Sequence, residues 1–470
     1  MNILLIIKKY NIMVNEKIMN KYVILIAMLA SFGVAFTSNA VSVALPTIAV
    51  DFNITNIIQN WLVNIYLLVI AAASVPFGKI CGKYGLNKTM GIGLIGYVVG
   101  SILSGIAFNI EFMLVARIIQ GIASAVLFVN SMAIITEQVP PQKRGQAIGI
   151  TVTGVYLGLT LAPTVSGFLV EYVGWRSIFY ITVPLILISY YLLTRIDKEW
   201  IIGGGDPIDV KGSLLYVVGI LILMYGFTIL HDVIGIITVV IGLVILAIFA
   251  KYELKEQYPI YDMHLFRNVK YTSSNIASLI SYFATFVVTY ILNYHLQYLN
   301  GFSPETTGLI LIVTPLIMAI GAPIAGRLSD KINPQILAAI GMIIVSIALV
   351  ILCFLDETTP LYMIFISMIL QGVGFSLFST PNNNVILGSV DKKDIATASA
   401  SLSTVRTIGQ SFSLGLLTLV FAYIMGNVPI IPQHYPQLIL SSQVTMILST
   451  ILCIIAILLS LMGIKSGNKN

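Results

Sequence analysis

Long apolar runs recur along the chain, separated by short stretches that hold most of its charged residues. A membrane-spanning helix needs about 20 mainly apolar residues, and by this measure the pattern predicts fourteen helices. The alternating pattern of barrel strands is absent, and backbone in lipid must hydrogen-bond within its own segment, so we interpret the runs as helices. The runs lie at residues 22–45, 57–79, 90–108, 112–136, 144–169, 177–194, 211–230, 234–250, 272–298, 305–326, 335–355, 361–387, 395–425 and 441–463.

Composition places the protein in the same class. Of its 470 residues, 58% are hydrophobic and only 9% are charged, which lies outside the range of soluble domains. Its three cysteines have no paired spacing, so neither a disulfide nor a metal site is expected. The sequence therefore predicts an all-α polytopic membrane protein without a cofactor.

The basic residues sort by side when the runs are laid out alternately. All but three of the 25 Lys and Arg fall on one side, while Arg176 lies on the other side and Arg117 and Arg406 lie within runs. The positive-inside rule makes the basic side cytoplasmic, with both termini on it, in the cytoplasmic (plasma) membrane. The net charge of +6 then reflects topology, and no nucleic-acid partner is expected.

The two halves of the chain echo each other. "RIIQGIASAVLF" at 117 is similar to "MILQGVGFSLFS" at 368, and "GKICGKYG" at 78 answers "GRLSDKIN" at 326. Parallel repeats predict two six-helix bundles with a substrate path between them near the midplane, joined here by an inserted helix pair. The expected division is a cytoplasmic segment 1–21, an N-terminal bundle 22–195, linkers and the inserted pair 196–270, a C-terminal bundle 271–463 and a cytoplasmic tail 464–470.

Several stretches, in order, resemble the fourteen-helix drug:proton antiporter branch of the major facilitator superfamily: "VSVALPTIA", "NWLVNIYLL", "RIIQG", "GLTLAPTVSGF", "WRSIFYITVP", "YPIYDMHLFRN" and "ATASASLSTVRTIGQS". The resemblance covers nearly the whole chain. It implies the major facilitator fold and multidrug efflux by alternating access, with small amphipathic compounds exported against protons in a secondary active antiporter that confers antibiotic resistance. A small-molecule substrate, protons and membrane lipids are the implied partners of a monomer.

Small residues mark expected packing and gating positions. In "GLTLAPTVSG" a small residue recurs every four positions, which lets a neighbouring helix approach closely, and the proline favours a kink. The loop "GRLSDKIN" resembles the family's latch between bundles, whereas "GKICGKYG" has Gly82 where the family usually has Asp, and Glu137 is a possible substitute. The expected gating and packing residues are Gly78, Gly85, Gly154, Gly158, Ala162, Pro163, Gly167, Gly326, Arg327 and Asp330.

Arg117 is the leading candidate for the substrate path, because a charge inside a span is costly and usually marks a pathway. Thr37, Asn39, Asn64 and Tyr66 lie at a similar depth, within one helical turn, so we expect Arg117 to hydrogen-bond to groups on the first two spans. Snorkelling of Arg117 to the outer surface is the alternative. The full set expected along the path is Thr37, Asn39, Asn64, Tyr66, Arg117, Gln120, Gln371, Arg406 and His295.

Acidic residues are missing from the membrane interior, since all 19 Asp and Glu fall in loops or at span ends. The family commonly has an Asp near Thr37, where an acid can exchange a proton against a cationic drug. Neutral, zwitterionic or anionic substrates are therefore expected over cations. Three alternatives stay open: an uncoupled facilitator, an exporter of one specific metabolite, and a non-transporting sensor. An enzyme is disfavoured, because no HExxH site, phosphate-binding glycine loop or large cytosolic domain is present.

Overall fold

The structure is a computed structural model that describes residues 2–52, 56–202, 207–230, 232–302, 304–391, 394–426 and 432–466. Within these ranges the regular structure is entirely helical. The chain order is α1 (Asn2–Phe52), α2 (Asn56–Tyr84), α3 (Leu86–Gly105), α4 (Ile110–Gln138), α5 (Pro141–Tyr172), α6 (Ser177–Tyr180), α7 (Val183–Leu193), α8 (Val210–Thr228), α9 (Val233–Glu253), η1 (Met263–Arg267), α10 (Val269–Thr285), α11 (Val287–Tyr294), η2 (His295–Leu299), α12 (Pro304–Leu311), α13 (Val313–Ser329), α14 (Pro334–Leu352), α15 (Leu361–Gly388), α16 (Ile395–Ile424), η4 (Pro432–His434) and α17 (Tyr435–Ser466).

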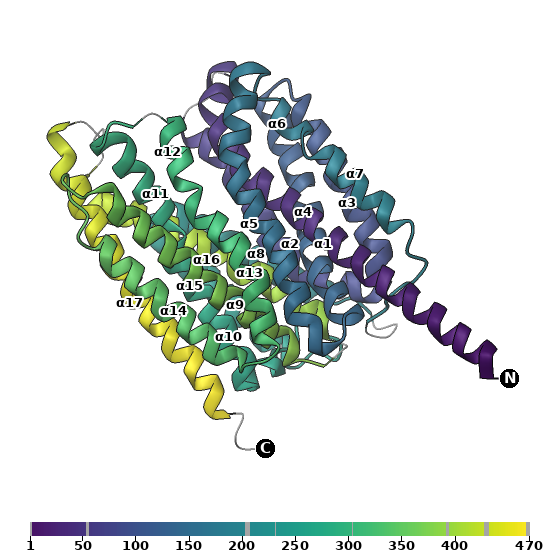
Figure 1. Ribbon diagram of the computed structural model, residues 1–470. Helices are drawn as coiled ribbons and strands as arrows, with labels where there is room; N and C mark the ends of the chain where they lie inside the picture. The colour runs from purple at the N-terminus through teal and green to yellow at the C-terminus, as the bar shows by residue number, and fades with distance from the viewer. Residues whose placement is uncertain are drawn as a thin grey trace.

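The helices form two groups, which we call the first bundle (α1–α7) and the second bundle (α10–α17). Within the first bundle α1 packs on α5 and α3 on α4, and within the second α14 packs on α15 and α10 on α17. Figure 1 shows the first bundle in purple and blue beside the second in green and yellow, with the start of α1 and the end of α17 toward the same, lower end. The division of the chain at the predicted domain boundaries stays a proposal.

Twelve helical segments of the described chain are long and apolar enough to cross a membrane. Two further predicted spans are helical but are not among these twelve. The segment Ser177–Leu193 is short and is divided between α6 and α7, while α16 is 30 residues long and contains Arg406. The polytopic all-α class is confirmed, and the count of fourteen crossings stays a prediction.

The predicted small-residue face of α5 packs on α1. A Cβ added to Gly154 would clash with the carbonyl of Met28, and one added to Gly158 would crowd the carbonyl of Phe32. Helices in lipid gain most of their attraction from such close packing, because no hydrophobic driving force acts between them there. This face therefore fixes α5 to α1 inside the first bundle.

Candidate functional site

Arg117 is fully buried in the first bundle, at 0% exposure. Its Nε donates to the carbonyl of Leu62 at 3.3 Å and its Nη1 to Oε1 of Gln120 at 2.6 Å, while its guanidinium carbon lies 4.1 Å from the ring centroid of Tyr66. Gln120 in turn donates to Ser101 at 2.8 Å. Full burial argues against snorkelling, and Nη2 has no hydrogen-bond partner among the described residues.

The link from Arg117 to the first two spans is partly direct. Leu62 and Tyr66 belong to α2 and contact the guanidinium itself. The hydroxyl of Tyr66 donates to the carbonyl of Val34 on α1 at 3.3 Å and also bonds Ser124 at 2.8 Å. The structure thus connects Arg117 to α2 directly and to α1 through the tyrosine.

Thr37, expected near Arg117 from its depth in the membrane, is hydrogen-bonded to another helix. Thr37, 1% exposed, is hydrogen-bonded to the hydroxyl of Tyr97 on α3, and Tyr97 donates to the carbonyl of Gly33 at 2.8 Å. Ser38 bonds back to its own helix at 2.9 Å. Asn39 is half-buried, and the side chain of Asn64 lies outside the described residues.

The second-bundle candidates have different surroundings. Gln371 on α15 donates to the carbonyl of Thr285 at 3.5 Å. Arg406 on α16 places its guanidinium 4.9 Å from the ring of Phe128 on α4, so this cation spans the two bundles. His295 is buried in η2, a short π-helical turn, with no partner for Nε2 among the described residues. Only Arg406 of these three contacts the first bundle in a described interaction.

The bundles meet closely along α5 and α13. A Cβ on Gly326 would clash with the carbonyl of Gly145, and one on Gly149 would crowd the carbonyl of Ala322. One turn further, Thr153 donates to the carbonyl of Ala319 at 3.0 Å. These contacts begin at the first turn of α5 and the last turn of α13, both on the basic side of the sequence layout. The bundles are therefore in contact at that side.

Asp330 adds two hydrogen bonds to the same contact. Its carboxylate accepts from the backbone N–H of Gly145 at 3.0 Å and of Gln146 at 3.2 Å, across the bundle interface. Arg327 reaches the amide oxygen of Gln146 at 3.2 Å in the amide orientation that satisfies both groups. Burial raises the pKa of the Asp330 carboxyl, although both backbone bonds act to lower it. Asp330 and Arg327 thus join this loop to the start of α5 in the other bundle, and the latch role stays a prediction.

At the loop between α2 and α3, the carboxylate comes from Glu199. Gly85, with φ +100°, turns the chain between α2 and α3, and Glu199 packs against it. The Glu199 carboxylate accepts from the first backbone N–H groups of α3, at Asn87 (2.8 Å) and Lys88 (3.0 Å). Glu137, the substitute considered from sequence, lies near Arg144 instead. The anion at this loop thus comes from the segment after α7.

The remaining gating candidates are less constrained. Gly78 is buried within α2, and Pro163 lies half-buried inside α5 with Ala162 buried beside it. A Cβ on Gly167 would meet nothing within 4 Å. No packing role for Gly167 follows from the structure.

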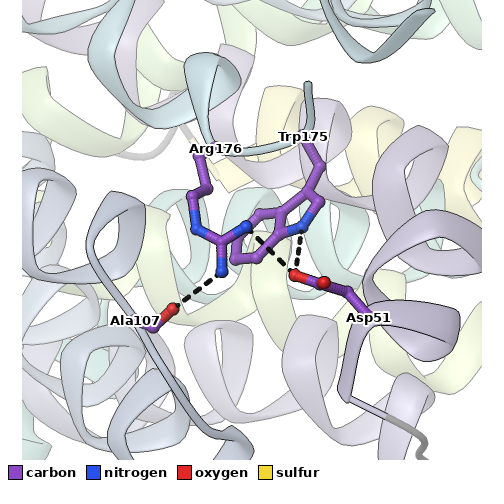
Figure 2. Close-up of polar contacts among 4 residues, drawn as sticks. All are labelled: Asp51, Ala107, Trp175 and Arg176. Carbon is purple, nitrogen blue, oxygen red and sulfur yellow. Dashed lines mark hydrogen bonds and ion pairs between the residues drawn. The ribbon is translucent and has the colours of Figure 1, made fainter.

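The opposite end of the first bundle carries a cluster that joins three segments (Figure 2). Gly174, with φ +101°, ends α5 and turns the chain into Trp175 and Arg176. Both side chains donate to Oδ2 of Asp51 at 3.0 Å, and Arg176 also donates to the carbonyl of Ala107 at 3.2 Å. The cluster ties the end of α1 to the turns after α3 and α5.

Sequence reasoning missed four contributors to this arrangement. Tyr97 and Ser101 lie one turn apart on α3, and nothing in their own pattern distinguishes them from ordinary packing residues. Gly145 and Gly149 form a second small face of α5, and their spacing of four is a signal that could have found them. Among the described residues, no group of three or more His, Cys, Asp or Glu is placed to hold a metal ion.

Comparisons with known proteins give the same picture. The family model described as Major Facilitator Superfamily matches residues 27–207 and 275–469. The riboflavin transporter RibZ of Clostridioides difficile (strain 630) is 27% identical over 449 residues, covering 95% of this chain and 98% of RibZ. The multidrug efflux pump LfrA of Mycolicibacterium smegmatis is 26% identical, covering 84% of this chain and 80% of LfrA.

Solved structures with low sequence identity share the fold. The human organic anion transporter MFSD10 (TETRAN) superposes with a TM-score of 0.68 at 11% identity, covering 95% of this chain and 99% of that one. The proton:xylose symporter XylE gives a TM-score of 0.62 at 16% identity, with coverage of 92% and 94%. The relatives include multidrug efflux proteins, as the sequence resemblance implied. The chain belongs to the Major Facilitator Superfamily and is a multi-span membrane transporter rather than an enzyme.

Proposed function

We propose that this transporter exports a small amphipathic compound across the cytoplasmic membrane by alternating access, driven by proton antiport. The observation that carries the alternating-access part of the proposal is the contact between α5 and α13, where glycines and alanines let two backbones meet on the basic side. Interfaces made of small residues with few interlocking side chains can separate and close again at low cost. Closure on one side of the membrane is what an alternating-access carrier requires.

The proposed path lies between the bundles and is positive in character. Arg117 is buried, with no hydrogen-bond partner for Nη2 among the described residues, and Arg406 lies at the bundle interface. Coulomb energy between unit charges about 4 Å apart is roughly 4 kcal/mol even at an effective dielectric of 20, so a cation near either residue is disfavoured. A neutral, zwitterionic or anionic amphiphile is the substrate class that this path favours.

Transport of one specific metabolite is a second candidate with its own support. RibZ, whose name states riboflavin transport, aligns over nearly its full length, and the planar uncharged ring of riboflavin fits the substrate class above. Uncoupled facilitation also remains compatible with the chain, because its acidic residues lie at span ends or in loops. The contact between the bundles on the basic side is equally compatible with proton antiport, transport of one metabolite and uncoupled facilitation.

Liposomes containing the purified protein distinguish the candidates. Uptake of riboflavin, a neutral antibiotic and a quaternary ammonium dye is followed with and without an imposed pH gradient. Proton antiport requires gradient-dependent accumulation, a facilitator gives equilibration only, and a specific carrier moves riboflavin alone. Thr37→Asp tests the charge argument, because the new carboxylate should increase dye transport; strong wild-type dye export that this variant leaves unchanged would refute it.

A further inference from the structure

The inserted helix pair carries two carboxyl groups at its basic-side end. Asp209 is the residue that caps the start of α8, and Glu253 is the last residue of α9. Glu253 is 1% exposed, and the two side chains lie within hydrogen-bonding reach of each other. They lie where the start of α8 meets the end of α9, two helices that also pack against each other along their length.

One oxygen of each carboxyl group is fully engaged. Oδ1 of Asp209 accepts from the backbone N–H of Gly212 at 3.0 Å and from the hydroxyl of Tyr252 at 3.2 Å. Oε2 of Glu253 accepts from the backbone N–H of Tyr261 at 3.1 Å. These donors hold both carboxyl groups in fixed orientations, so each presents its second oxygen toward the other.

The second oxygens have no donor. Oδ2 of Asp209 and Oε1 of Glu253 are both buried without a hydrogen-bond partner among the described residues. They also share one place, because a Cβ built on Gly212 would clash with each of them. Two ionised carboxylates do not lie face to face in a buried site, because the repulsion between two adjacent negative charges makes one of the groups keep a proton.

No surrounding group of the described chain donates a hydrogen bond to either of these two oxygens. Within the described chain, neither carboxyl group forms an ion pair with Lys or Arg, and the neighbouring lysines of α8 and α9 are exposed. The titratable and charged groups around the pair are two exposed lysines, three tyrosines and one further acid. They are Lys211, Lys251, Tyr252, Tyr261, Tyr271 and Glu256.

We propose that Asp209 and Glu253 form a proton-binding site in which one proton is shared between Oδ2 and Oε1. The proton enters from and returns to water on the basic side, where Asp209 is only half-buried. A divalent metal ion is a poorer occupant, because calcium takes six to eight oxygen ligands and magnesium six, and only two oxygens are free here. The inference concerns proton binding and does not depend on the proposed transport function.

The site is mechanically connected to both bundles. The hydroxyl of Tyr216 on α8 donates to the carbonyl of Ala71 on α2 at 3.1 Å and bonds Thr404 on α16 at 3.1 Å. Tyr261, next to Glu253, bonds Ser401 on α16 at 3.1 Å. Loss of the shared proton leaves two facing negative charges, which repel and loosen the inserted pair where it contacts α2 and α16.

Infrared difference spectroscopy of the full-length protein in lipid nanodiscs tests the site directly. At about pH 7 exposed Asp and Glu are ionised, since their ordinary pKa values are near 4, whereas the shared proton should give a carboxylic-acid carbonyl band. Glu253→Gln and Asp209→Asn should each remove that band, because the introduced amide donates the hydrogen that the proton supplied. Asp209→Asn also keeps the oxygen that caps α8, so it serves where Glu253→Gln folds poorly.

The matched control is Glu357→Gln, which changes an exposed acid and should leave the band intact. Absence of the band in the wild type, or its persistence in both variants, would overturn the proposal. A carboxylate shift on adding millimolar magnesium or calcium, seen in the wild type but in neither variant, would assign the site to a metal ion and would equally overturn it.

Discussion

Replacing Arg117 with Gln should abolish transport while changing stability little. The substitution removes a charge-assisted hydrogen bond to Gln120, worth about 1.5–3 kcal/mol, and stacking on Tyr66, worth about 2 kcal/mol when desolvated. Against these losses, the burial of a guanidinium whose Nη2 has no partner in the described part of the chain costs several kcal/mol. The two contributions largely cancel, so the change in the free energy of unfolding should stay within about 2 kcal/mol.

The assay compares liposome uptake with thermal or denaturant unfolding of the same preparations. Arg176→Gln is the matched control, because Arg176 also stacks on an aromatic ring, at 4.2 Å from Trp175, yet its side chain is 43% exposed. That variant should lose at most about 1 kcal/mol, as exposed ion pairs do, and should keep transport. Wild-type uptake by Arg117→Gln would reduce Arg117 to a packing residue and refute the reasoning.

Three further outcomes are expected. Gly326→Val should hold the basic side open, because a branched side chain there clashes with the α5 backbone. Cysteines on the basic side should then react faster with a thiol reagent than in the control variant Gly167→Val, and equal labelling in the two variants would contradict this. Burial raises the pKa of Asp330 above its ordinary value of about 3.9, so protonation of this carboxyl favours the closed contact between α5 and α13. The contact should therefore weaken as the pH rises through the raised pKa of Asp330. Fluorescence transfer between α5 and α13 should follow this trend in the wild type but not in Asp330→Asn. In a cysteine-free background in intact cells, an impermeant reagent should label a cysteine at Glu357 and not one at Lys143, and the reverse would invert the orientation.

Hydropathy and charge predict most of the fold because they act through the membrane. The apolar runs correspond to helices, and a buried arginine in a span stands out since its cost there is high. Helix breaks are harder to foresee: the segment that starts at Ser177 divides between α6 and α7 at Ile181 and Thr182, with a proline at position 184 opening the second piece. Such breaks depend on neighbouring helices that can satisfy the freed backbone groups.

The site was less predictable, because its partners are distant in sequence. Depth along a helix correctly placed Tyr66 near Arg117, but depth does not give the direction of a side chain. Thr37 therefore points to Tyr97 on α3, and Glu199 reaches the start of α3 from beyond α7. Pairings of this kind are fixed by helix packing and rotation, which one sequence does not specify.

Alternating access is the central claim, and a reversible cross-link between the bundles tests it most directly. Ser74 on α2 and Ser403 on α16 are hydrogen-bonded at 2.9 Å across the interface, so cysteines at both positions in a cysteine-free background should form a disulfide. Oxidised protein in liposomes should lose uptake of riboflavin and of the neutral antibiotic, with recovery on reduction and no effect in either single-cysteine variant. Undiminished transport by the fully cross-linked protein would contradict the account.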